Sequence, residues 1–256
     1  RRVLRCQRQV QRPRRRQRVE QDRCRRTGRE DAADAVGQGD ASPRRILHRA
    51  SGTRGPRQRV QIDAEHIAEL APSWAVFLAE HEDGIAPLVF WTPGHAGVAA
   101  RHLACAVAGR RYSRWFVSED MTAPVDRAYG SFVHALSRLA GGFPRPERVP
   151  FASPRPVLEA LRAMLERGEH PCVNTAPSAA ATLALLACAR GASLDGVTFL
   201  LGAEPLTDAR RATISASGAR TAVLYGSSEA PWIGAQCRTP GSADAVHVLR
   251  DGYAAI

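Results

Sequence analysis

Two rhythms of apolar and polar residues run through positions 63–224. Residues 63–80 carry apolar side chains three and four positions apart, which predicts an amphipathic helix that Pro72 kinks or divides. Short apolar runs between turn-forming residues predict buried strands instead. Strands are expected at 87–91, 112–117, 172–175, 197–201 and 221–224, and further helices at 96–108, 125–139, 157–165, 178–189 and 208–217.

The alternation of strand and helix predicts an α/β fold. Strands joined by crossover helices run parallel, and helices then cover both faces of the sheet. In such sheets, ligands sit at the loops that leave the carboxyl ends of the strands. The loops after Leu201 and Leu224 are therefore the places to look for chemistry.

Residues 1–45 follow neither rhythm. All 36 basic residues of the chain are arginine, and the net charge of +11 reflects an excess of arginine before residue 50. Such a segment cannot bury enough apolar surface to offset its ordering entropy, so disorder is expected. It is interpreted as a nucleic-acid-binding tail, a solvated extension without a role, or a shifted reading frame. Residues 46–256 are expected to form the folded domain.

Three segments carry candidate chemistry. The first is Ser51-Gly52-Thr53-Arg54-Gly55-Pro56-Arg57, where glycines and hydroxyls suit a loop around phosphates. A flexible linker is the alternative.

The second segment is Gly202-Ala203-Glu204, which follows an apolar strand and precedes a helix that Thr207 or Asp208 can cap. A flat ligand could lie against the Gly-Ala backbone. The alternative is an ordinary strand-to-helix turn.

The third segment is Tyr225-Gly226-Ser227-Ser228-Glu229, at a strand's carboxyl end. The ring can stack on a base, a hydroxyl can donate to a phosphate, and the carboxylate can hold Mg²⁺, which prefers oxygen ligands. A polar turn capped by glutamate is the alternative.

The order of these segments resembles the adenylate-forming (AMP-binding) superfamily, with its phenylacetate–CoA ligase-like branch nearest. The stretch 174–178 also resembles that family's segment before its Gly-Gly-Glu turn. The resemblance implies the partial large N-terminal domain of such an enzyme, which activates a small-molecule carboxylic acid with ATP and Mg²⁺ as an acyl-adenylate, with CoA as a candidate co-substrate.

The resemblance also implies a role for each residue. Ser51, Gly52, Thr53 and Gly55 would surround the β- and γ-phosphates, with Arg57 or Arg59 in place of the usual lysine. Gly202, Ala203 and Glu204 would border the adenine. Tyr225 would flank its ring, followed by Gly226 and Ser227; Ser228 would touch the α-phosphate, and Glu229 would bind Mg²⁺.

The chain contains no lysine, and the later elements of the family are not found in it. The expectation is a domain without its small C-terminal partner and with little complete ligase turnover. A protein thiol as acyl acceptor is one alternative, and nucleic-acid binding through residues 1–45 is the alternative from another class. Nothing in residues 46–256 resembles a nucleic-acid module.

No apolar run reaches the length of a membrane span, and residues 1–26 lack the apolar core of a secretory signal, so a cytoplasmic protein is expected. His95 follows a predicted strand and could face the acid, although a capping or solvent-facing role is the simpler interpretation. Cys237 and His247 could contribute to a metal site, although a buried thiol and a surface histidine are the simpler interpretation.

Overall fold

A computed structural model describes most of the chain beyond residue 45. The described residues are 46–49, 59–62, 64–81, 86–93, 96–118, 144–227, 232–240 and 245–248. All of them belong to one compact unit, Arg44–Ile256. The helix expected at 125–139 and the predicted arm 1–45 lie outside these residues.

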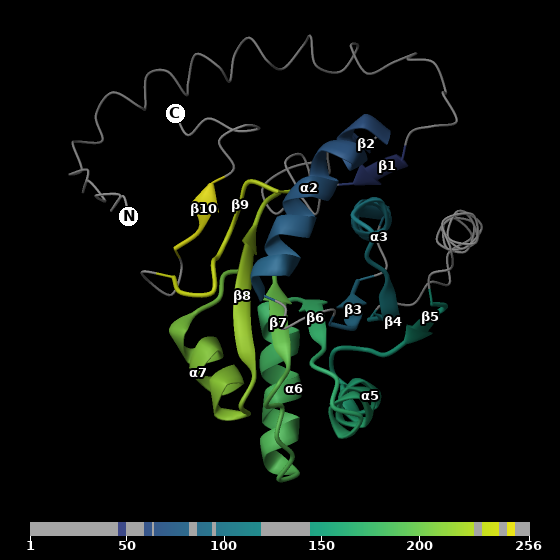
Figure 1. Cartoon of the computed structure of the whole chain (residues 1–256). Coiled ribbons are helices and arrows are strands. Elements are labelled where there is room, and N and C mark those ends of the chain that lie inside the picture. The colour runs from purple at the N-terminus through teal and green to yellow at the C-terminus, as the bar shows by residue number, and fades with distance from the viewer. Residues whose placement is uncertain are drawn as a thin grey trace, which may run out of the picture. The chain divides into compact units, whose positions relative to one another are not determined.

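The centre of the fold is an eight-stranded sheet (Figure 1). Its strands in spatial order are β10 (His247–Val248), β9 (Gly234–Ala235), β8 (Arg220–Tyr225), β7 (Thr198–Leu201), β6 (Cys172–Thr175), β3 (Leu88–Thr92), β4 (Tyr112–Val117) and β5 (Pro146–Arg148). The six strands from β8 to β5 are parallel, and β9 and β10 add an antiparallel end. The predicted α/β class with a mostly parallel sheet is confirmed.

Helices cover both faces of the sheet. Helices α5 (Arg155–Glu166), α6 (Pro177–Ala189) and α7 (Asp208–Ala216) lie on one face, and α2 (Ala64–His81) and α3 (Ala96–Val107) lie on the other (Figure 1). Pro72 lies inside α2, which continues through it as one helix. The hydroxyl of Thr207 caps α7 by accepting a hydrogen bond from the Arg210 N–H at 3.4 Å.

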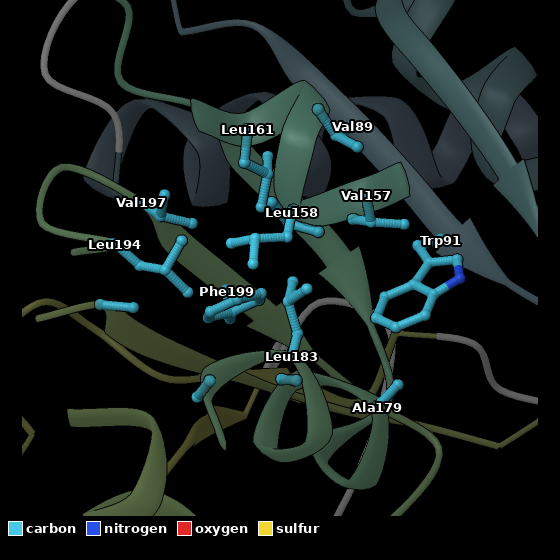
Figure 2. Packing of buried hydrophobic residues seen from close by; sticks show 14 of the residues in the cluster. Val89, Trp91, Val157, Leu158, Leu161, Ala179, Leu183, Leu194, Val197 and Phe199 are labelled. Atoms are coloured by element: carbon cyan, nitrogen blue, oxygen red, sulfur yellow. The ribbon is translucent and has the colours of Figure 1, made fainter. Parts of the chain in front are cut away.

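Each face of the sheet has its own apolar core. On the α5–α6 face, Leu158, Leu161 and Leu183 pack against Phe199 of β7 (Figure 2). On the α2–α3 face, Trp74 and Phe77 of α2 meet Trp232, with ring centroids 4.6 Å and 5.4 Å from it. Because successive strand residues point to opposite faces, burial on both sides requires the continuous apolar runs that the sequence shows.

The order of the strands reverses between β3 and β6. From β3 the chain passes through α3 to β4 on one side, whereas from β6 it passes through α6 to β7 on the other. Neighbouring crossovers therefore leave in opposite directions at the carboxyl ends of β3 and β6. Such a topological switch point is where open α/β sheets bind ligands.

A separate two-stranded antiparallel sheet precedes α2. It consists of β1 (Ile46–Arg49) and β2 (Arg59–Ile62), with Arg49 opposite Arg59. Strand β1 also contacts α3. Residues 50–58, which include the predicted phosphate loop, connect the two strands.

Candidate functional site

The structure brings two of the three predicted segments together at the carboxyl end of the sheet. Strands β7 and β8 are parallel neighbours in which Leu201 pairs with Val223. A Cβ atom on Gly202 would lie 3.6 Å from the carbonyl oxygen of Leu224. The turn Gly202–Glu204 and the segment starting at Tyr225 therefore adjoin each other.

The turn after β7 holds an uncommon backbone conformation. Ala203 has a φ of 71°, in the left-handed region, which costs a residue with a Cβ about 1 kcal/mol. The N–H of Gly202 donates to the carbonyl oxygen of Thr175 at 3.3 Å, which ties the turn to the end of β6. A strained turn fixed by its neighbours at a sheet's carboxyl edge is typical of a binding site.

Glu204 fastens this turn to the start of α6. The hydroxyl of Ser178 donates to its Oε1 at 2.8 Å, and the Ser178 N–H donates to its Oε2 at 3.3 Å. Arg210 forms a salt bridge with the same Oε2 at 3.0 Å. Because Ser178 is in the first turn of α6, the Glu204 carboxylate also lies at the positive end of that helix dipole. The Glu204 side chain thus holds the turn in place, with Gly202 buried and Ala203 exposed at the carboxyl edge of the sheet.

Tyr225 ends β8 with its side chain 58% exposed. Its carbonyl oxygen accepts a hydrogen bond from the Ile233 N–H at 2.9 Å, so the backbone at its position is anchored to the strand that returns. Gly226 and Ser227 are exposed beside it. An anchored backbone that presents an exposed aromatic ring suits stacking on a planar base.

Several predicted site residues lie outside the described residues and are not located. These are Ser51, Gly52, Thr53, Gly55, Arg57, His95, Ser228 and Glu229. Only the flanks of the first segment are placed, in β1 and β2. Their pairing puts the backbones at Arg49 and Arg59 opposite each other at the two ends of the connection.

A polar group lies at the switch point: Asn174, from the stretch 174–178, together with Thr92 and Arg101, which the sequence analysis did not single out. Asn174 is 2% exposed and Thr92 is 7% exposed, and neither the Asn174 Nδ2 nor the Thr92 Oγ1 has a hydrogen-bond partner among the described residues. Nη1 of Arg101, on α3, donates to Oδ1 of Asn174 at 3.4 Å. The sequence does carry a signal for this group, because Asn174 and Thr92 are polar residues near the ends of mainly apolar strands.

Thr175, next to Asn174, belongs to the opposite face of the sheet. Strand alternation places it with Val173, which packs in the α5–α6 core, whereas Asn174 pairs in register with Phe90 of the α2–α3 core. The Thr175 side chain is therefore separated by the sheet from Arg101.

His102, beside Arg101 in sequence, is not a second cation. Its ring lies 4.8 Å from Phe90, 4.6 Å from Tyr112 and 4.8 Å from Trp115, measured between centroids. Burial lowers the pKa of His102 to about 3, so the imidazole is neutral near pH 7. The positive charge at this end of α3 is therefore carried by Arg101.

No metal cage is found in the described part of the chain. No group of three His, Cys, Asp or Glu side chains there could hold a metal ion. His247 lies in β10, and Cys237 is a partly buried free thiol. Among the same residues, no helix has the length and hydropathy of a membrane span.

Comparison with known proteins gives similarities among solved structures only. No family model matches the sequence, and no curated protein matches it. The chain is similar to a 2-hydroxyisobutyryl-CoA ligase in complex with 2-HIB-AMP and CoA, with 18% identity and a TM-score of 0.40 over 75% of this chain and 35% of that one. It is also similar to an AMP-forming acyl-CoA synthetase/AMP-acid ligase II-like protein from Dyadobacter fermentans DSM 18053 (16% identity, TM-score 0.46, 81% of this chain and 48% of that one).

A third similar structure is a fatty acid AMP ligase from Legionella pneumophila, with 15% identity and a TM-score of 0.45 over 80% of this chain and 34% of that one. All three neighbours are named as acid–CoA or acid–AMP ligases. The chain spans less than half the length of each. At these TM-scores the likeness gives no residue-by-residue correspondence.

Proposed function

We propose that this chain activates a carboxylic acid with ATP, forming an acyl-adenylate. The observation that carries the proposal is that the Gly202–Glu204 turn lies beside the end of β8 at Leu224, directly before Tyr225, at the carboxyl ends of β7 and β8. These two segments resemble the adenine-binding parts of adenylate-forming enzymes. Their adjacency places an anchored backbone turn and the exposed ring of Tyr225 at the ends of neighbouring strands.

In the proposed reaction, a carboxylate oxygen of the acid attacks the α-phosphorus of ATP. A carboxylate–phosphorus bond forms, the bond to the β-phosphate oxygen breaks, and pyrophosphate leaves with the electron pair. The protein's task is to position the reactants and to neutralise charge. Tyr225 would stack on the adenine, the Gly202–Ala203 backbone would border it, and the Ser228 hydroxyl would hold the α-phosphate.

The donor set fits a metal that is shared with the substrate. Glu204 is held by Ser178 and Arg210, so Glu229 is the carboxylate of these two segments assigned to Mg²⁺. The described residues offer no all-protein cage, and Mg²⁺ commonly binds through one or two carboxylates and substrate phosphates. When bound, the ion would supply positive charge to the phosphates. Residues 51–57 would hold the β- and γ-phosphates.

The finer assignment is to the acid–CoA ligase-like enzymes, in the phenylacetate–CoA ligase-like branch. It rests on the order of the three segments together with the strand-to-helix segment 174–178. Under this assignment, CoA is the acyl acceptor, and a protein thiol is the alternative. An acyl-transfer assay with CoA and with a carrier-protein thiol distinguishes the two acceptors.

Titration calorimetry with Mg·ATP tests the nucleotide site. We expect the folded chain to bind Mg·ATP, and Tyr225→Ala to weaken binding about tenfold, because stacking of a base on an aromatic ring contributes ~1–3 kcal/mol. Leu185→Ala is the matched control, since Leu185 is a similarly exposed apolar side chain at 61%. The proposal is wrong if folded protein binds no Mg·ATP, or if the two variants lose affinity equally.

A further inference from the structure

Three polar side chains lie on the same face of the sheet at the topological switch point. Asn174 of β6 is in register with Phe90 of β3, and Thr92 follows two residues later on the same face. Arg101 reaches Asn174 from α3, the helix that begins just beyond β3. This group therefore occupies the position at which open α/β sheets bind ligands.

Arg101 is in none of the salt bridges found among the described residues. Arg114, Arg155, Arg162, Arg167 and Arg210 each pair with a glutamate. Arg101 pairs with no carboxylate among the described residues; its hydrogen bond goes to a neutral amide oxygen at 3.4 Å. A part-buried guanidinium without a counter-ion is unfavourable unless a ligand supplies one.

The surrounding groups do not neutralise this charge. Burial lowers the pKa of Arg101, yet a guanidinium remains protonated in proteins. Tyr112 interacts with Arg101, but burial raises the pKa of its phenol well above the ordinary value, so the phenol is neutral. Cys105 Sγ lies 3.6 Å from the Tyr112 hydroxyl and belongs to the buried core.

The remaining donors point to the same kind of ligand. Within the described part of the chain, the Asn174 amide oxygen accepts a hydrogen bond from Arg101, whereas the buried Asn174 Nδ2 and the buried Thr92 hydroxyl have no hydrogen-bond partner. Buried polar groups in folded proteins nearly always have a partner. A carboxylate has two acceptor oxygens, and it can take hydrogen bonds from a guanidinium, an amide and a hydroxyl together.

We propose that Arg101, Asn174 and Thr92 bind a second carboxylate of the acid, so that the substrate is a small dicarboxylic acid. The inference rests on the proposed function, which places the reacting carboxylate near the nucleotide at β7 and β8. Asn174 lies two strands from β8, a separation of about 10 Å across the sheet. One end of the acid is activated while the other end is held at the switch point.

Acid binding to the full chain tests this inference by calorimetry. The probes are succinate, glutarate and adipate, each compared with the monocarboxylate of equal chain length. We expect at least one dicarboxylate to bind about tenfold or more tightly than its monocarboxylate counterpart, since hydrogen bonds to charged groups are the stronger class. Equal binding of the two series would overturn the inference.

Two variants assign the preference to these residues. Arg101→Met removes the charge and should abolish the advantage of the dicarboxylate while leaving the Kd for Mg·ATP unchanged. Asn174→Asp gives Arg101 a permanent partner, so it should fold even where Arg101→Met does not, and it should also abolish the advantage. Thr175→Val, on the opposite face of β6, is the matched control and should keep it. Persistence of the preference in Asn174→Asp contradicts the inference.

The controls separate this inference from the proposed function. If Mg·ATP binds and the two acid series bind equally, the second-carboxylate site is wrong and adenylation stands. If the dicarboxylate preference depends on Arg101 but Mg·ATP does not bind, adenylation is wrong and the anion site stands without its assignment to that reaction. If inorganic phosphate binds as tightly as the dicarboxylates and competes with them, the site takes a free anion, and the dicarboxylic acid assignment is wrong.

Discussion

The two faces of the sheet differ in how many polar side chains they bury. The α5–α6 face packs Leu158, Leu183 and Phe199, and Trp91 donates its indole N–H to the Val149 carbonyl at 2.9 Å; its Thr175 hydroxyl is buried without a hydrogen-bond partner among the described residues. On the α2–α3 face, the indole nitrogens of Trp74 and Trp115 are buried with no partner in the described part of the chain. That face also holds His102, Asn174 and Arg101.

The difference indicates where stability and function lie. A face that packs mostly apolar side chains at close-packed density contributes most to the free energy of folding. A face that keeps donors unpaired near the carboxyl edge gives up part of that stability, which proteins do at binding sites. The comparison predicts that substitutions on the two faces will have opposite effects.

The largest effect is expected on the α5–α6 face. Phe199→Ala removes a fully buried ring and should lower the free energy of unfolding by about 3–5 kcal/mol, measured by urea denaturation. Val76→Ala, at a side chain 71% exposed on α2, is the control and should change stability by less than about 0.5 kcal/mol. A small loss for Phe199→Ala would mean that this face is not the main core.

Acid should destabilise the protein through the α2–α3 face. The folded-state pKa of His102 is about 3, below the unfolded value near 6.5, so between these values the unfolded chain binds the extra proton. Stability is then retained above about pH 6.5 and lost at about 1.4 kcal/mol per pH unit as the pH falls. Burial also lowers the pKa of His81, which acts in the same direction.

His102→Leu removes this dependence and measures it. Between pH 7 and pH 4, the free energy of unfolding should fall by roughly 3 kcal/mol less in His102→Leu than in the parent chain. The difference accumulates over the about 2.5 pH units below 6.5. Equal slopes in His102→Leu and the parent would contradict a buried neutral imidazole.

The smallest expected change in stability is an increase. Thr92→Val replaces a buried hydroxyl, which has no hydrogen-bond partner among the residues that the structure describes, with a methyl group of similar shape, so it should raise stability by about 1 kcal/mol. On the same reasoning it should weaken binding of the second carboxylate. Thermal unfolding of the free chain gives the first quantity. A loss of stability would show that the hydroxyl already has a partner in the free protein.

Sequence reasoning recovered the elements that have long, strong patterns. Strands β4 and β6 lie at the predicted residues, and α3, α6 and α7 lie within about two residues of their predictions. Each of them is set by a local run of apolar residues. The short strands β5, β9 and β10 have two or three residues each and no run to detect, and β5 is fully exposed at the edge of the sheet.

The arrangement of the elements depends on contacts that a local pattern does not encode. Alternation predicted parallel strands, but not that β6 would pair with β3 rather than with β5. The switch-point group follows from that pairing, because Arg101 and Asn174 are 73 residues apart in the chain. The adjacency of the β7 turn and the end of β8 was easier to predict from the sequence, because the two segments follow predicted strands that are consecutive in the chain.

Photolabelling tests the nucleotide assignment most directly. Irradiation of the chain with 8-azido-ATP and Mg²⁺, followed by digestion at arginine, should label peptides 191–210 and 221–238, which contain the Gly202–Glu204 turn and Tyr225. Unlabelled ATP should suppress that label. Suppressible label confined to other peptides would contradict a nucleotide site at the carboxyl ends of β7 and β8.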